Sequence, residues 1–142
     1  MINRRGNLKA LALATALSVG SFVTLPNALA ADTIKVGVLH SLSGTMAISE
    51  TVLKDTVLMA IDEINAKGGV LGRKLSFVVA DETENPETGI NAIKKLTADE
   101  KVDVIVGGYT SGVTLAQLPH ISSAKTIYLG VGAASPAITA KV

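Results

Sequence analysis

Three short segments are rich in glycine and small hydroxyl side chains, a composition suited to binding a small polar molecule. They are HSLSGT at 40–45, GGYTSG at 107–112 and GAASP at 132–136. Glycine lets a backbone approach a ligand closely, and a Ser or Thr hydroxyl both donates and accepts hydrogen bonds. Each segment also precedes an expected helix, whose first-turn amide groups attract anions. The chemistry indicated is recognition of a small polar molecule, including a carboxylate that is held without Lys or Arg.

Residue types that could form a catalytic site are present, but not in an arrangement that supports catalysis. His40, Asp81 and Ser111 fall at expected strand ends and could be imagined as a hydrolytic triad. Tyr109 breaks the G-x-S-x-G pattern, and the order of the three residues along the chain is wrong for that fold. No G-x-G-x-x-G follows the first expected strand, and segment 69–75 lacks the P-loop spacing. We therefore expect neither enzyme activity nor a cofactor.

The acidic segment 81–87, DETENPE, has two interpretations. Its carboxylates could bind a divalent cation. Alternatively, it is a solvated loop that leads into a helix, with Asn85 as the N-cap and Pro86 at the first position. We favour the second interpretation, because no ligand geometry can be inferred from the segment. The chain has no cysteine, which excludes disulfides and thiolate metal sites.

Residues 1–30 have the composition of a secretory signal peptide. Arg4, Arg5 and Lys9 form a basic start, a short apolar run of small residues follows, and 28–30 is an A-x-A cleavage signal. A membrane anchor is the alternative, but the apolar run is shorter than the ~20 residues that a spanning helix needs. We expect cleavage before Ala31 and a soluble protein in the bacterial periplasm.

Residues 31–142 have no feature typical of nucleic-acid binding. They contain ten Lys plus Arg and twelve Asp plus Glu, so their net charge is slightly negative. Their aromatic residues are only Phe77, Tyr109 and Tyr128, too few for a base-stacking surface. The basic field that attracts nucleic acid is also missing, so we expect no nucleic-acid partner.

Strand and helix patterns alternate along residues 31–142. The strands are expected at 33–39, 74–81, 102–108 and 126–131. The helices are expected at 49–69, from Asn85 to about Ala98, at 111–125 with a bend at Pro119, and after Ser135-Pro136. Such alternation predicts an α/β fold with a doubly wound parallel sheet, and the apolar third strand is expected to be buried on both faces. Ligands of such sheets bind beyond the carboxyl ends of the strands, the edge at which the three hydroxyl-rich segments should meet.

Two longer segments resemble the beginning of the type I periplasmic solute-binding proteins. They are IKVGVLHSLSGTMAISE and VLMAIDEINAKGGVLGRKL. The family serves ATP-driven importers of branched-chain amino acids, urea and short amides, and the resemblance covers residues 33–142. It implies a small-molecule ligand, a membrane permease of an ABC importer as partner, and no enzyme activity.

The resemblance implies roles for particular residues. Ser111 matches the serine that binds the ligand carboxylate, and Tyr109 and Thr110 lie beside it. In the loop after the fourth strand the usual hydroxyl position is Ala134, with Ser135 one residue later. The implied ligand-binding set is Ser43, Gly44, Tyr109, Thr110, Ser111, Gly132, Ala133, Ala134 and Ser135. The loop after the fourth strand favours an aliphatic amino acid. The first loop is closer to urea and short-amide binders, although the third loop lacks the Cys-Trp pair of the urea type.

Members of this family have two lobes, each of domain size. Residues 31–142 match only the N-terminal part of lobe one, so we interpret the chain as a fragment. A ligand-sensing receptor ectodomain would share this lobe and is a second alternative. We expect one strand to be left at a sheet edge without the neighbours of a complete lobe, and the strands at 102–108 and 126–131 both have the composition that aggregates when exposed. We therefore expect residues 31–142 on their own to be marginally stable or self-associating.

Overall fold

The computed structural model describes residues 33–140, so the expected cleavage site before Ala31 lies outside them. The strands are β1 (Ile34–His40), β2 (Leu75–Asp81), β3 (Val104–Gly107) and β4 (Ile127–Gly130). The helices are α1 (Ala47–Ala66), α2 (Pro86–Lys94) with a π-helical turn η1 (Lys95–Asp99), α3 (Ser111–Ala124) and α4 (Pro136–Thr139). The alternating order that the sequence predicts is confirmed.

The four strands form a parallel sheet in the order β2-β1-β3-β4. β1 therefore has β2 on one side and β3 on the other, and the strand order reverses between β1 and β3. Open α/β sheets bind ligands outside the carboxyl ends of the strands at such a reversal. The fold thus places the end of β1 and the end of β3 at the expected position of a binding site.

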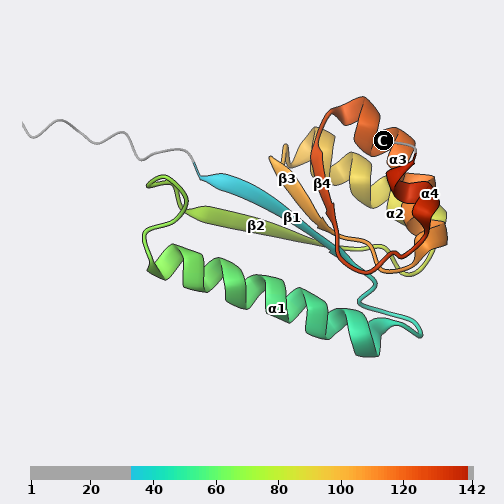
Figure 1. The fold of residues 1–142 in the computed structure, drawn as a ribbon, viewed down its shortest axis with the longest axis horizontal. Coiled ribbons are helices and arrows are strands. Elements are labelled where there is room, and N and C mark those ends of the chain that lie inside the picture. The colour runs from blue at the N-terminus through green and yellow to red at the C-terminus, as the bar shows by residue number, and fades with distance from the viewer. Residues whose placement is uncertain (1–32, 141–142) are drawn as a thin grey trace, which may run out of the picture.

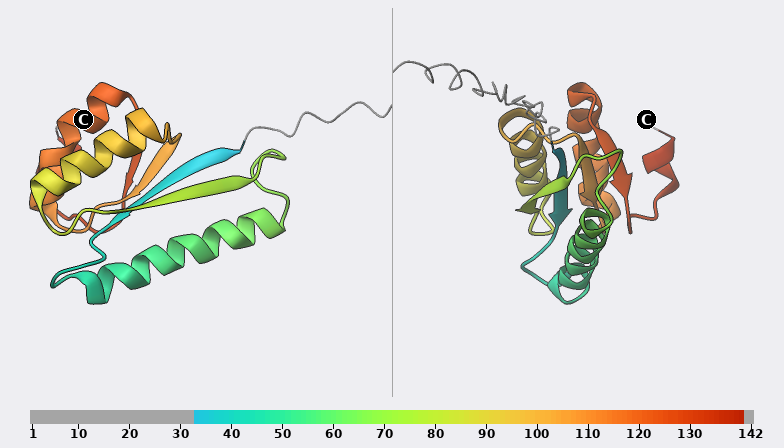
Figure 2. Two further views of the ribbon diagram at one scale, coloured as in Figure 1. Left: turned by 180° about the vertical axis from the view of Figure 1, so that it is seen from behind. Right: turned by 90° about the vertical axis from the view of Figure 1, so that its left-hand side faces the viewer.

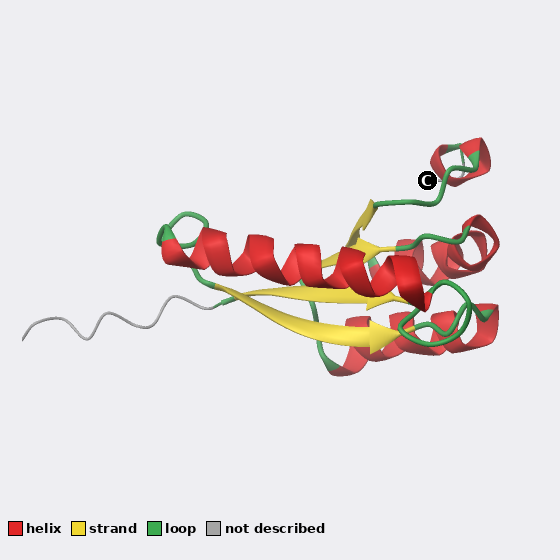
Figure 3. Ribbon diagram, turned by 90° about the horizontal axis from the view of Figure 1, so that it is seen from below, coloured by secondary structure: helices red, strands yellow, loops and turns green. Residues whose placement is uncertain are grey.

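Helices cover both faces of the sheet, as a doubly wound fold requires. α1 lies on one face, and α2 and α3 lie on the other (Figures 1 and 2). Under α1, the buried side chains of Val36, Val38 and Ile61 form a small apolar core. A larger apolar core lies between the sheet and the α2–α3 side, and it contains Leu39, Ala92, Ile93, Leu96, Val102, Ile105, Leu118 and Ile121. Figure 3 shows the molecule from the α1 side, with α1 in front of the strands.

Helix α1 ends slightly earlier than the sequence indicates. Two glycines follow the helix: Gly68 and Gly69 have positive φ angles, and their amide groups donate to the carbonyls of Asn65 and Ile64. The helix proper stops at Ala66. Ile64, in the last turn of the helix, is 37% exposed.

The β3–β4 side of the sheet is less covered than expected. Val104 and Val106 are only half-buried, so the prediction that β3 is buried on both faces is wrong. The reason is that α1 packs mainly against β1 and β2. β4 is an edge strand of the described sheet, with Ile127 64% and Leu129 52% exposed. Self-association through this edge stays a prediction. Within residues 33–140, no helix combines the length and apolar character needed to cross a membrane.

Candidate functional site

Backbone hydrogen bonds join the loop that follows β3 to the loop that follows β4. The amide groups of Gly132 and Ala133 donate to the carbonyl oxygen of Gly108, at 3.1 and 3.2 Å. The amide of Val131 donates to the carbonyl of Gly107 at 3.2 Å. Two of the three hydroxyl-rich segments therefore form one surface at the carboxyl edge of the sheet.

Aromatic packing and two glycines fix the shape of this surface. The ring of Tyr109 lies so close to Gly132 that a Cβ there would be 2.5 Å from a ring carbon. Gly108 has a φ of +78°, and a Cβ on it would lie 1.9 Å from the hydroxyl of Tyr128. At Gly108 both the positive φ and the close Tyr128 hydroxyl favour glycine, and at Gly132 a side chain would have to displace the Tyr109 ring.

Ser111 has a hydroxyl that is free to donate to a ligand. Its oxygen accepts a hydrogen bond from the amide of Ser135 at 3.2 Å, which leaves the hydroxyl proton for another acceptor. Ser111 is also the first residue of α3, and Thr110 at the N-cap makes no side-chain capping bond. The first-turn amides of α3 are therefore not capped by Thr110, and with the hydroxyl they suit a carboxylate.

The last candidate loop contributes less side-chain chemistry than the sequence indicates. The hydroxyl oxygen of Ser135 accepts from the amide of Ala137 at 3.3 Å and so caps the short helix α4. Ala134 is exposed and has no polar side chain, and Ala133 is half-buried. This loop can therefore offer a ligand mainly backbone groups.

The first hydroxyl-rich loop is tied to the acidic loop after β2 rather than to Ser111. The hydroxyl of Ser43 donates to Asp81 at 3.0 Å, and the hydroxyl of Thr45 donates to Glu84 at 2.8 Å. Gly44, with a φ of +82°, lies beside the Glu84 carboxylate. Ser43 and Gly44 are exposed at the same edge of the sheet, but the hydroxyl proton of Ser43 is already used.

The acidic segment is a helix cap, as expected, but it is not simply solvated. Asn85 accepts hydrogen bonds from the amides of Glu87 and Thr88 at 2.9 and 3.1 Å, which confirms the N-cap. Glu82, however, is completely buried, contrary to the interpretation of a solvated loop. Its side chain points toward α3, where the amide of Gln117 donates to it. Within residues 33–140, no three His, Asp or Glu side chains are arranged to hold a metal ion.

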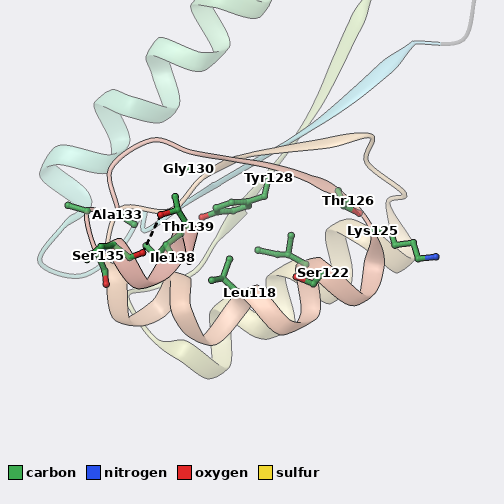
Figure 4. A pocket seen from close by; sticks show the side chains of 13 residues that line it. Leu118, Ser122, Lys125, Thr126, Tyr128, Gly130, Ala133, Ser135, Ile138 and Thr139 are labelled. Atoms are coloured by element: carbon green, nitrogen blue, oxygen red, sulfur yellow. Dashed lines mark hydrogen bonds between the residues drawn. The ribbon is translucent and has the colours of Figure 1, made fainter. Parts of the chain in front are cut away.

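A cavity of about 440 Å³ lies between α3, β4 and α4 (Figure 4). Its walls include the apolar side chains of Leu118, Ile121 and Ile138, together with Tyr128. Of the candidate residues, only Ala133, Ala134 and Ser135 line it, and residues 109–111 do not. Because the cavity lies beside the unpaired edge of β4, we do not assign it to the ligand.

A layer of buried polar side chains beneath the loops was not predicted from the sequence. It contains His40, Ser41, Glu50, Glu82, Thr114 and Gln117, all completely buried, and Tyr128. His40 Nδ1 lies 3.0 Å from a carboxylate oxygen of Glu50, which also accepts from the amide of Ser41 at 2.9 Å. A polar layer of this kind rigidifies a fold only where its groups find partners.

Two members of this layer have strongly altered acidity. Burial raises the pKa of Glu82 from 4.5 to about 7, the hydrogen bond from Gln117 opposes the rise, and the charges of Glu50 and Asp81 add to it. Burial also raises the pKa of Tyr128 to about 12. The nearby Thr114 hydroxyl opposes the shift of the Tyr128 pKa, although within residues 33–140 neither hydroxyl has a partner in full hydrogen-bond geometry.

One sequence signal could have revealed part of this layer. Gln117 stands between Val113 and Ile121 at four-residue intervals, on the stripe of α3 that is otherwise apolar and buried. A polar residue on a buried stripe requires a buried partner. The identity of that partner, Glu82, could not be inferred because it lies 35 residues away in the sequence.

Comparison with known proteins relates this architecture to solute-binding proteins. Residues 34–129 match a family described as periplasmic binding protein domain. The Leu/Ile/Val-binding protein BraC3 of Rhizobium johnstonii is 37% identical over 101 residues, which are 71% of this chain and 27% of that protein. The Leu/Ile/Val-binding protein homolog 7 of Brucella melitensis is 34% identical over 124 residues, 87% of this chain and 31% of that protein.

Solved structures show the same fold. The branched-chain amino acid transporter substrate binding protein LivJ of Streptococcus pneumoniae, in complex with isoleucine, gives a TM-score of 0.74 at 29% identity. That alignment covers 77% of this chain and 31% of LivJ. A solute binding protein of an ABC transporter from R. palustris, in complex with 4-hydroxybenzoate, gives a TM-score of 0.65 at 34% identity. That alignment covers 78% of this chain and 30% of the R. palustris protein. The chain thus spans between 27% and 31% of the length of these relatives.

Proposed function

We propose that the chain contributes to ligand capture for an ABC importer. The proposal rests on family: the chain belongs to the periplasmic binding protein domain family and has the fold of its type I members. The ligand that we propose is an aliphatic amino acid, bound through its carboxylate. The permease of the importer would be the protein partner. We also propose export through the leader 1–30 and a mature N-terminus at Ala31, which N-terminal sequencing of the exported protein would test.

The observation that carries this proposal is the arrangement at the start of α3. The Ser111 hydroxyl accepts from the amide of Ser135 and keeps its own proton for a ligand oxygen. The N-cap residue Thr110 leaves the first-turn amides of α3 uncapped. A carboxylate at this position would receive a hydroxyl proton and amide protons at the positive end of a helix, and a hydrogen bond to a charged group is stronger than a neutral one.

The relatives favour a carboxylate over an uncharged amide. The two solved structures described above hold isoleucine and 4-hydroxybenzoate, and both molecules carry a carboxylate. Urea and short amides carry none. An aromatic acid is the second candidate ligand, because the structure that holds 4-hydroxybenzoate is 34% identical to this chain. The names of the two curated relatives, both Leu/Ile/Val-binding proteins, favour the aliphatic amino acid.

Calorimetry with a small panel of ligands tests the proposal. Leucine, isoleucine, valine, 4-hydroxybenzoate and urea would each be titrated into the full-length protein. We expect binding of at least one of the amino acids at micromolar affinity or tighter, equivalent to about −8 kcal/mol, and no binding of urea. Binding of 4-hydroxybenzoate alone would replace the aliphatic ligand by an aromatic acid. Binding of urea alone would contradict a carboxylate anchor.

A further inference from the structure

Glu82 and Gln117 each leave one buried oxygen without a partner. Gln117 Nε2 donates to Glu82 Oε2 at 2.5 Å, and both side chains are completely buried. Among the residues that the structure describes, the remaining oxygen of each side chain, Oε1 of Glu82 and Oε1 of Gln117, has no hydrogen-bond partner. Two acceptor oxygens on two side chains that are already joined cannot satisfy each other unless a proton lies between them.

We propose that Glu82 takes up a proton and forms a two-bonded acid–amide pair with Gln117, and that this pair positions the start of α3. In the pair, the protonated Oε1 of Glu82 donates to Oε1 of Gln117 while Gln117 Nε2 donates to Oε2 of Glu82. The only covalent change is the new O–H bond on Glu82, and its proton comes from solvent. Both orphaned oxygens then gain a partner, which removes the desolvation penalty of two unsatisfied buried groups.

The surroundings of the pair favour a neutral Glu82. The carboxylates that act on it are Glu50 on α1 and Asp81 on β2, and together with burial they raise the pKa of Glu82 to about 7. His40 on β1 is engaged with Glu50 rather than with Glu82. On β4, the hydroxyl of Tyr128 is close enough for the Glu82 and Glu50 charges to raise its pKa. A second negative charge beside Glu50 is therefore unfavourable.

Close packing holds the amide of Gln117 in this position. Gly89 on α2 leaves room for it, because a Cβ there would lie 2.4 Å from Gln117 Nε2 and 2.9 Å from Val113. α2 and α3 approach closely at this point, and the amide lies between Gly89 and the carboxyl of Glu82. Gln117 is six residues, less than two turns, along α3 from Ser111. The pair thus joins the end of β2 to the helix that begins with Ser111.

The dependence of stability on pH follows from the direction of the shift. Below about pH 4.5, folded and unfolded chains both hold the proton on Glu82. Between about 4.5 and 7 the folded state keeps a proton that the unfolded state has lost, so stability falls as the pH rises through this range. Above about 7 the folded state has lost the proton as well, and the contribution is absent. If the pair positions Ser111, affinity for a carboxylate ligand also falls as the pH rises through about 7.

Thermal unfolding of the full-length protein between about pH 5 and pH 8.5 tests whether Glu82 is protonated, and it needs no ligand. We expect the wild-type midpoint to fall relative to that of Glu82→Gln by about 2 °C or more over this range, because the variant is neutral throughout and keeps two bonds to Gln117. Glu87→Gln is the matched control, since Glu87 is an exposed acid in the same segment, and it should follow the wild type. A Glu82→Gln variant with the same pH dependence as the wild type would overturn the pair.

Infrared spectroscopy of the wild type covers the case in which Glu82→Gln does not fold. At about pH 6, ordinary Asp and Glu side chains are ionised, so a protonated-carboxyl band that disappears by about pH 8.5 is expected from Glu82. A spectrum without that band would overturn the proposal. The positioning role rests on the proposed function and has its own readout, leucine affinity against pH. We expect a loss of about fivefold or more from pH 6 to 8.5 in the wild type and none in Glu82→Gln.

The two readouts fail independently. One outcome is that affinity has the same pH profile in the wild type and in Glu82→Gln, while the unfolding midpoints differ with pH as expected. This outcome would support protonation of Glu82 and refute the positioning role. Absence of leucine binding at every pH would count against the proposed ligand and refute the positioning of its anchor. The unfolding and infrared results would still decide on the acid–amide pair itself.

Discussion

Gly107→Ala is expected to destabilise the protein by about 3 kcal/mol or more, because there is no space for a methyl group between β3 and β1. A Cβ on Gly107 would lie 2.0 Å from the carbonyl oxygen of Leu39 and 2.9 Å from its carbonyl carbon. The neighbouring atom is backbone and not the end of a flexible side chain. Relief requires that the two central strands move apart, which breaks their pairing at the edge that carries the candidate site.

Urea unfolding of the full-length protein would measure this effect, with Gly112→Ala as the matched control. Gly112 is exposed in the first turn of α3, and in the described part of the chain a Cβ there would meet no atom within 4 Å apart from its chain neighbours and the adjacent backbone of its own helix. Alanine is the better helix former, so the control should be neutral or slightly stabilising. An unchanged unfolding midpoint for Gly107→Ala, with an unchanged slope, would show that β1 and β3 tolerate a wider separation than the described packing allows.

The strand ends illustrate which part of this protein could be predicted from its sequence. The alternation of apolar strands and amphipathic helices determines a parallel sheet, and a parallel sheet brings all carboxyl ends to one edge. Prediction of a shared surface for Tyr109, Ser111 and Gly132 needed no further information, and the hydrogen bonds between the two loops confirm it. Whether these residues bind the ligand stays a prediction.

Pairings between residues far apart in the sequence could not be predicted. The hydroxyl of Ser43 donates to Asp81, 38 residues later, while contact of Ser43 with a ligand stays a prediction. Glu82 has the local sequence of a solvated acidic loop, and its burial depends on Gln117 of a different helix. Both contacts depend on how neighbouring strands and helices dock, and the alternation of apolar residues along one segment carries no information about such partners.

The incomplete burial of apolar side chains on β3 and β4 also depends on how distant elements dock. Val104 and Val106 have the apolar pattern of a strand buried on both faces, yet they are only half-buried. The apolar pattern shows which side chains of a strand are suited to burial. Whether they are buried depends on the position of α1. α1 packs over β1 and β2, so the β3–β4 side of that face keeps apolar side chains exposed, among them Leu129.

Ser111→Ala is expected to weaken leucine binding by the full-length protein more than tenfold. The change removes the hydroxyl proton that we propose for the ligand carboxylate, and a lost hydrogen bond to a charged group costs roughly 1.5–3 kcal/mol. It also removes the acceptor for the amide of Ser135, so the loop after β4 loses one of its bonds to α3. Calorimetry would give the affinity, and urea unfolding would show that the fold is retained.

Two controls separate a direct contact from a general effect on the helix. Ser123→Ala alters a second serine of α3, exposed near the other end, whose hydroxyl donates to the carbonyl of Pro119, and it should leave affinity unchanged. Leucinamide, which lacks the carboxylate, should bind the wild type weakly and lose little further affinity in Ser111→Ala. Equal losses for leucine and leucinamide would mean that Ser111 supports the loop without contacting the carboxylate. An unchanged leucine affinity in Ser111→Ala would rule out the Ser111 hydroxyl as a contact of the ligand carboxylate.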